Sequence, residues 1–131
     1  MNPEYQKCRL RTPLAPADLP ESFAVVTAHN PSGKELTAGE NSSRNEQLQQ
    51  QIFEKNFSFF PVTGFDPGSD YAEPGYGINC TEDEAIALAK SWDQEAIFYV
   101  EDWTIYLTAC ADGKREVHGT WDDLADHSPA D

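Results

Sequence analysis

Two capping boxes show where helices begin in this chain, and they constrain its fold more than any other feature. In each box a threonine is followed three positions later by a glutamate, as in Thr37 with Glu40 and Thr81 with Glu84. Such pairs satisfy backbone N–H groups that the first turn of a helix leaves without partners. They predict one helix over residues 38–55 and a second helix that starts just after residue 81.

Apolar segments rich in β-formers surround both predicted helices. Residues 23–28 are apolar at consecutive positions, as in a central strand, and Asp112-Gly113 predicts a hairpin turn. Further strands are expected at residues 57–63, 73–79, 96–100, 103–109 and 115–119. The order β-α-β-β-α-β-β-β predicts an α+β domain, with a mainly antiparallel sheet of five to six strands and both helices packed on one face.

The two ends of the chain lack the periodicity of helices and strands. Residues 1–20 hold four prolines and are expected to form an extended N-terminal arm, and residues 122–131 are expected to form an acidic C-terminal tail. The single α+β domain is then assigned to residues 21–121. With 131 residues and a hydrophobic content of 39%, the chain suits one domain with a real core.

The net charge of −14 is concentrated in the second part of the sequence. Residues 1–55 carry a net charge of −1, whereas residues 56–131 carry −13. Such a field repels nucleic acid and anionic membranes, and it attracts basic surfaces. The competing explanation is that the acids keep a small protein soluble or reflect a salty host cytoplasm.

Compartment and cofactor use can also be judged from the sequence. No apolar run is long enough for a membrane span, and the first residues lack the apolar block of a secretory signal, so a cytoplasmic protein is expected. Cys8, Cys80 and Cys110 are odd in number and far apart, which predicts neither a disulfide framework nor a zinc site. No motif indicates a cofactor, a metal or a catalytic nucleophile, and none is expected.

The first predicted helix carries amides where a core face is expected. At 100° per residue, Asn41 and Asn45 fall on the same narrow stripe as Leu48 and Ile52, with Arg44 on its flank. The stripe is therefore apolar at its C-terminal end and polar at its N-terminal end. The polar end lies next to the loop that precedes the helix.

Two interpretations of these polar residues stay open. In a ligand site, Arg44 would bind a carboxylate, the amides would bind a polar ligand, and Glu73 or His29 would act as a base. In a structural plug, the amides would bind loop backbone groups while Arg44 pairs with Glu73. The plug is favoured, because buried polar groups need partners in any case. The polar cluster, as it is called below, consists of His29, Asn30, Asn41, Arg44, Asn45, Glu73 and Gln94.

Several short motifs follow one another along the chain. They are Thr27-Ala-His-Asn-Pro31, Glu40-Asn41, Arg44-Asn45 with Leu48, Pro61-Val-Thr-Gly64, Tyr71-Ala-Glu-Pro74 and Trp92-Asp-Gln-Glu-Ala-Ile-Phe98. Through these motifs the chain resembles, over about residues 23–109, the bacterial family called domain of unknown function 3293. The resemblance implies a small α+β domain and no particular activity. It is also one of the two reasons for including Glu73 in the polar cluster.

Aromatic side chains among the carboxylates predict a protein-binding surface. Acids steer a basic partner and rings anchor it, although the same rings could pack beneath the N-terminal arm. The aromatic residues that exceed what one sheet face can bury are Tyr71, Tyr76, Trp103, Tyr106 and Trp121. The residues expected to bind a partner are Asp66, Asp70, Tyr71, Glu82, Asp83, Glu101, Asp102, Trp103, Asp122 and Asp123.

The main hypothesis is therefore a non-enzymatic binding or inhibitory protein that engages the basic surface of another protein. One form of it is a nucleic-acid mimic, such as a phage or mobile-element inhibitor of a defence nuclease, and a mimic needs its acids in rows on one face. Direct binding of nucleic acid or membrane is not expected. The alternative is a small polar-ligand-binding protein or an enzyme, with its site around Asn41, Arg44 and Glu73.

Overall fold

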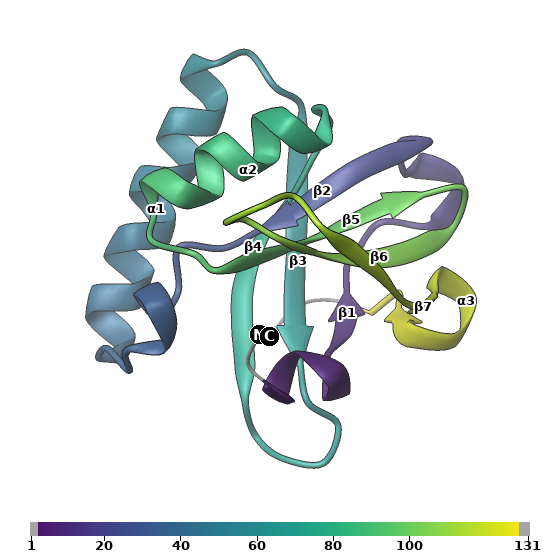
Figure 1. Ribbon diagram of the computed structural model, residues 1–131, viewed down its shortest axis with the longest axis horizontal. Helices are drawn as coiled ribbons and strands as arrows, with labels where there is room; N and C mark the ends of the chain where they lie inside the picture. Colours follow the sequence, from purple (N-terminus) through teal and green to yellow (C-terminus); the bar gives the residue numbers. More distant parts are fainter. Residues whose placement is uncertain (1–2, 129–131) are drawn as a thin grey trace.

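One curled sheet organises the molecule, and its strands follow the order β7-β6-β5-β2-β4-β3-β1-β8. The computed structural model describes residues 3–128 (Figure 1). Neighbouring strands are antiparallel except for the short β1–β8 pair, which is parallel. The strands are β1 (Arg9–Arg11), β2 (Ser22–Val26), β3 (Phe59–Phe65), β4 (Ala72–Ile78), β5 (Ala96–Glu101), β6 (Thr104–Ala109), β7 (Arg115–Thr120) and β8 (Ala125–Asp126).

Both capping boxes begin helices where the sequence predicts them. The Thr37 hydroxyl accepts from the Glu40 N–H at 3.1 Å, and the Thr81 hydroxyl accepts from the Glu84 N–H at 3.1 Å. The helices are α1 (Ala38–Glu54), α2 (Glu82–Ser91) and the short α3 (Trp121–Leu124), with 3₁₀ turns η1 (Pro3–Lys7), η2 (Pro16–Asp18) and η3 (Pro31–Gly33). Within the described residues, no helix combines the length and the apolar character that crossing a membrane requires.

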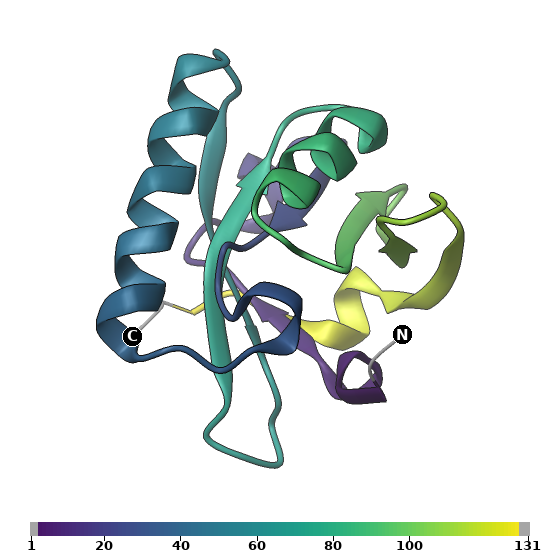
Figure 2. The same ribbon diagram turned by 60° about the vertical axis from the view of Figure 1, so that its left-hand side comes forward.

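The two main helices lie on one face of the sheet, which confirms the predicted α+β arrangement (Figures 1 and 2). Leu48 and Ile52 of α1 and Leu88 of α2 pack in one buried cluster with Val26 of β2 and Ile97 of β5. Burying each such side chain contributes about 1.5–3 kcal/mol. The apolar end of the α1 stripe therefore anchors the helix, and its polar end is carried to the end of β2.

The inner face of the curled sheet holds a second apolar cluster. Phe23 packs edge-to-face against Phe60 and Trp121, with ring centroids 5.2 and 5.4 Å apart. Trp121 is only 1% exposed and lies in the same cluster as Leu10 of the N-terminal segment, so of its two expected places the exposed one is wrong and the packed one is correct. Tyr71 and Trp103 are exposed, at 45% and 49%.

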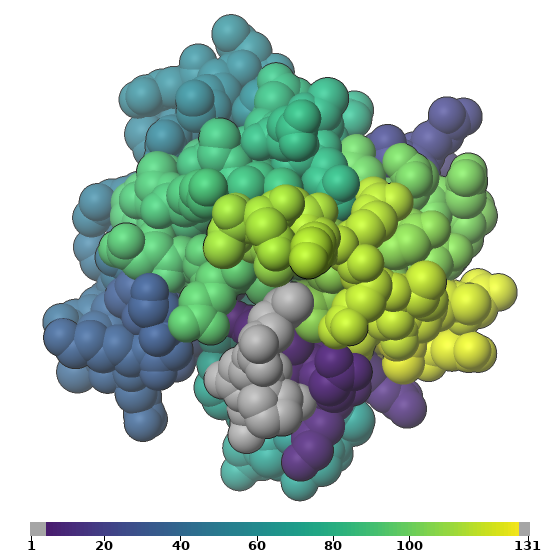
Figure 3. Space-filling model, viewed as in Figure 1, coloured from purple at the N-terminus to yellow at the C-terminus, as the bar shows by residue number. Residues whose placement is uncertain are grey.

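The two ends of the chain add strands to the sheet, which differs from the expected arm and tail. Leu10 in β1 pairs with Gly64 of β3 on one side and with Ala125 of β8 on the other. The sheet therefore has eight strands instead of the predicted five to six. Figure 3 shows the N-terminal and C-terminal segments side by side on one face. Strands of two or three residues are too short to show a period in the sequence, and residues 1–2 and 129–131 of the expected arm and tail lie outside the described part.

Candidate functional site

The amides of α1 bind the loop between β2 and the helix. Asn41 Oδ1 accepts from the Asn30 N–H at 2.9 Å, and Asn41 Nδ2 donates to Asn30 Oδ1 at 2.9 Å. One turn further on, Asn45 Oδ1 accepts from the Ala28 N–H at 2.9 Å, and its Nδ2 donates to the Pro74 carbonyl at 2.8 Å. Both asparagines are buried. Their amides thus provide hydrogen bonds for backbone groups that are taken out of water.

Arg44 binds backbone carbonyls from two further segments. Its Nε donates to the Ala28 carbonyl at 2.7 Å and its Nη2 donates to the Trp92 carbonyl at 2.8 Å. The guanidinium carbon also lies 5.2 Å from the centroid of the Trp92 ring. The expected ion pair between Arg44 and Glu73 is wrong, because the guanidinium points at these carbonyls, whose positions cannot be read from residue types.

Gln94 and His29 complete the polar cluster. Gln94 Nε2 donates to the His29 carbonyl at 3.1 Å and to the Trp92 carbonyl at 3.3 Å. The His29 ring lies 3.4 Å from Asn41 Nδ2, measured from Nε2, and burial lowers its pKa below the ordinary value. Apart from Glu73, the cluster is therefore held in a network that joins α1, the preceding loop and the turn after α2.

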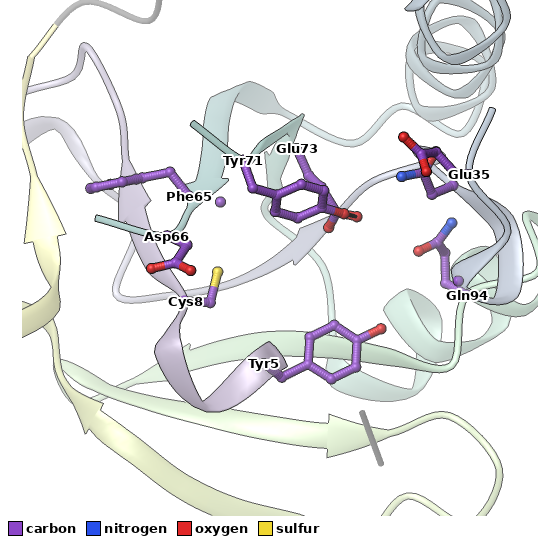
Figure 4. A pocket seen from close by; sticks show the side chains of 11 residues that line it. Tyr5, Cys8, Glu35, Phe65, Asp66, Tyr71, Glu73 and Gln94 are labelled. Atoms are coloured by element: carbon purple, nitrogen blue, oxygen red, sulfur yellow. Dashed lines mark hydrogen bonds between the residues drawn. The ribbon is translucent and has the colours of Figure 1, made fainter. Parts of the chain in front are cut away.

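A cavity of about 370 Å³ opens beside this network (Figure 4). Its walls come from η1, the loop after η3, the β3–β4 hairpin and the turn after α2. Its volume falls within the range of small-molecule sites, about 300–1,000 Å³. Polar side chains that line it are Tyr5, Asn30, Glu35, Asp66, Tyr71, Glu73 and Gln94.

Glu73 is a half-buried carboxylate in the middle of this cavity. The Tyr71 hydroxyl donates a hydrogen bond to Glu73 Oε1, and the two side chains lie together in Figure 4. Burial raises the pKa of Glu73, and the smaller effect of the Tyr71 hydrogen bond opposes it. None of the ion pairs found within residues 3–128 includes Glu73. The carboxylate therefore bears the cost of desolvation without a basic side chain to offset it.

Tyr5 and Cys8 form the wall on the N-terminal side of the cavity. Burial, with the charge of Glu73 adding to it, raises the pKa of each to about 12. Both side chains therefore stay protonated at neutral pH, and the Tyr5 ring, which packs edge-to-face on Phe98 at 6.5 Å, is neutral. Sequence reasoning missed both residues, since only the pairing of β1 with β3 brings this segment to the site.

Beneath the main cavity lies a smaller one of about 40 Å³, which shares Tyr5 and Glu73 with it. Its apolar walls include Val25, Phe98 and Leu107 from the inner face of the sheet. The combined space therefore has a polar, acidic mouth and an apolar floor.

The cysteines and the other potential metal ligands do not form a second candidate site among the described residues. All three cysteines are free, and burial raises the pKa of Cys80 to about 12 and also raises that of Cys110. In the part of the chain that the structure describes, no three His, Cys, Asp or Glu side chains gather as metal ligands would. The cavity around Glu73 is thus the best-formed candidate site.

The residues expected to bind a basic partner lie in several separate regions. Glu82 and Glu101 both pair with Arg115, at 3.2 and 3.3 Å, so part of their charge is used within the molecule. The β3–β4 loop, at the lower end in Figure 1, is far from α2 at the upper end. That loop carries Asp66 and Asp70, α2 begins with Glu82 and Asp83, the β5–β6 turn holds Asp102 and Trp103, and α3 holds Asp122 and Asp123. Binding of a basic partner surface, with nucleic-acid mimicry as one form of it, stays a prediction.

Comparisons with other proteins bear on the same segments. No curated protein and no solved structure matches the chain. The family model described as "Protein of unknown function (DUF3293)" matches residues 26–97, more than half of the chain. The matched segment contains the whole polar cluster and Tyr71, whereas Tyr5 and Cys8 lie before it. The chain therefore belongs to the DUF3293 family of proteins of unknown function.

Proposed function

We propose that this protein is a binding protein for a small organic molecule, which it takes up in the cavity around Glu73. The observation that carries the proposal is a half-buried carboxylate, without a basic partner among the described residues, in a cavity of ligand size. Perturbed carboxylates in clefts are typical of functional sites. The site expected from the sequence included Asn41 and Arg44 of α1. The proposed site keeps Glu73, but its other walls come from η1, the β3–β4 hairpin and the turn after α2.

The polar cluster has a supporting role in this proposal. Asn30 and Gln94 line the cavity, and both are fixed from behind: Asn30 by Asn41, and Gln94 by the carbonyls of residues 29 and 92. A wall held in this way needs little reordering when a ligand arrives, which favours affinity. In this proposal the polar cluster holds two walls of the cavity in place and is not a separate binding site.

A ligand screen observed by amide NMR tests the proposal. Diverse small molecules are added to the folded protein, and we expect shifts that concentrate at Tyr5, Cys8, Gly64 and Asp66. The surface hollow at Gln49, Gln50 and Phe53 serves as an internal control. Replacing Tyr5 with Ala removes one wall and should weaken each hit by about tenfold. A screen without hits, or with hits only at the control hollow, would contradict the proposal.

A second candidate function, binding of a basic protein partner, is favoured by the β5–β6 turn. Asp102 and Trp103 are the two central residues of a tight hairpin and have the positive φ angles, of 51° and 60°, that a type I′ turn requires. The turn thereby presents a half-exposed indole beside carboxylates, as in a steering and anchoring surface.

The three free thiols favour a cytoplasmic location, so the partner is sought among cytoplasmic proteins. A capture experiment at low and then high salt tests this second candidate. We expect a basic partner that high salt releases, and we expect the Trp103→Ala variant to lose it. The Val117→Ala variant, changed at an even more exposed apolar position, should retain it. Equal capture by both variants would contradict a role for the turn.

A further inference from the structure

We infer that the ligand of the Glu73 cavity is an organic ammonium ion carried on a short apolar group. This inference rests on the proposed function, because it names the chemical class of the molecule bound at that same site. Four features of the cavity lead to it: its charge, its hydrogen-bonding groups, its aromatic walls and its floor.

The charge of the cavity selects a cation. Glu35, Asp66 and Glu73 contribute carboxylates, and none of the described residues that line the cavity is basic. Glu73 is the innermost of the three, since it also borders the space below. A carboxylate that is partly withdrawn from water interacts strongly with an opposite charge placed beside it. An anionic ligand would meet three like charges.

Two hydrogen-bonding side chains of the cavity, Gln94 and Glu73, present acceptor oxygens to a ligand. Gln94 Nε2 donates hydrogen bonds to two backbone carbonyls, so Oε1 is the atom of this amide that can accept from a ligand. Glu73 receives the Tyr71 hydroxyl at Oε1 and keeps further acceptor capacity on its other oxygen. In Figure 4 the ends of Glu73 and Gln94 approach the same space from two sides. An ammonium group has three N–H donors and no acceptor, so it complements these oxygens.

The aromatic walls favour an organic cation. Tyr5 and Tyr71 both contribute phenol rings to the lining, and Figure 4 shows the Tyr71 ring beside Glu73 and the Tyr5 ring below both. A tyrosine ring is neutral at pH 7.5, well below the ordinary pKa of a phenol, so the π-face of Tyr5 is available to a cation. Rings and a carboxylate together are a common way to bind ammonium groups.

The apolar walls of the smaller cavity favour a ligand that also carries an apolar group. The space of about 40 Å³ below Glu73 is bordered by Val25, Phe98 and Leu107. A short alkyl chain would cover this apolar surface, whereas a bare inorganic ion would leave it in contact with water. The ligand is therefore expected to have a charged head at Glu73 and an apolar body that points toward the sheet.

A titration with three probes of matched size tests the inference. n-Butylammonium, butan-1-ol and butyrate are each added at pH 7.5, and binding is followed by the amide shifts of the cavity. We expect n-butylammonium to bind at least about tenfold more tightly than butan-1-ol, as for a hydrogen bond to a charged group, and butyrate not to bind.

Two variants separate the role of the charge from a change in fold. Glu73→Gln keeps the size of the side chain and should remove the preference for the ammonium probe. Glu21→Gln removes the same charge at an exposed position next to β2 and should keep that preference. Amide spectra of both variants establish that they are folded, and Tyr5→Leu, which retains an apolar wall, should weaken n-butylammonium more than butan-1-ol.

The outcomes distinguish this inference from the proposed function. If butan-1-ol or butyrate shifts the cavity amides with equal or higher affinity, the ammonium inference is wrong while the binding function stands. Unchanged preference in Glu73→Gln would overturn it as well. If no probe binds and the broader ligand screen is also negative, both the inference and the proposed function fail.

Discussion

The Tyr71 hydroxyl donates a hydrogen bond to the Glu73 carboxylate inside the cavity. Tyr71 immediately precedes β4 and Glu73 is the second residue of that strand, and their hydrogen bond shows that both side chains lie on the same side of the hairpin. Tyr71 thereby orients a carboxylate that lacks a basic neighbour within residues 3–128. This pair is the centre of the proposed site.

Replacing Glu73 with Gln should stabilise the protein at neutral pH. Burial raises the pKa of Glu73 in the folded state, so the folded protein holds this proton more readily than the unfolded chain does. Stability is then greatest below the unfolded pKa of about 4.3 and falls as the pH rises toward the folded pKa. Glutamine cannot ionise, and its amide oxygen still accepts from Tyr71.

Urea unfolding at pH 7.5 and at pH 3.5 measures this effect. The variant should be the more stable protein at pH 7.5, and its advantage should disappear in acid. The titratable groups that face Glu73 are the phenols, the thiol and the two other acids of the cavity: Tyr5, Tyr71, Cys8, Asp66 and Glu35. A variant that is less stable than the native protein at pH 7.5 would show that the carboxylate is satisfied within the fold.

Replacing Arg44 with Ala should destabilise the fold by about 2–4 kcal/mol, since two hydrogen bonds from a charged group are lost together. Those bonds join α1 to the carbonyls of Ala28 and Trp92. Arg44→Lys should cost less, because it keeps a charged donor without the planar fork that reaches both carbonyls. Denaturant unfolding measures both. The exposed Arg9→Ala change is the control, and a cost for Arg44→Ala no greater than for this control would contradict the structural role.

A methyl group at Gly77 should cost about 1–3 kcal/mol or more, as in an overpacked core. A Cβ at this position would come within 2.3–2.9 Å of the ring of Phe60, its partner on β3. Gly39 in the first turn of α1 is the matched control, since its Cβ would meet nothing within 4 Å. Gly39→Ala should instead stabilise by about 0.5–1 kcal/mol. Thermal unfolding of the two variants should therefore shift in opposite directions.

Cys8 should react slowly with iodoacetamide in the folded protein. With its pKa raised to about 12, on the order of one Cys8 side chain in ten thousand is thiolate at pH 8. Peptide mapping by mass spectrometry should show much faster labelling in urea, where burial is lost. If Cys8 reacts as fast in the folded protein as it does in urea, the burial of this wall of the cavity is contradicted.

Local signals in the sequence predict the helices well, but not the cavity. The capping box at Thr37 and the stripe through Asn45 depend on residues three or four apart, and both are confirmed. Strand β1 depends on the pairing of Leu10 with Gly64, more than 50 positions away, and its three residues carry no periodic pattern. Tyr5 reaches the site only through this pairing, so no local signal could have placed it there.

The polar cluster illustrates the same limit. Helical periodicity predicts that its amides and Arg44 lie together, which the structure confirms, whereas the predicted pairing of Arg44 with Glu73 is wrong. A search among side chains finds Glu73, whereas the actual acceptors are the carbonyls of Ala28 and Trp92, which every residue type possesses. Glu73 was thereby left free to face the cavity.

In the proposed complex, the Glu73 carboxylate binds the ammonium group of the ligand. The most direct measurement is the ¹³C chemical shift of the Glu73 carboxyl carbon, followed as a function of pH with and without n-butylammonium. We predict a titration midpoint above that of an exposed glutamate in the free protein, because burial raises the pKa of Glu73. Saturating n-butylammonium should lower that midpoint, since a bound cation stabilises the ionised carboxylate. A midpoint that n-butylammonium leaves unchanged would contradict the claim.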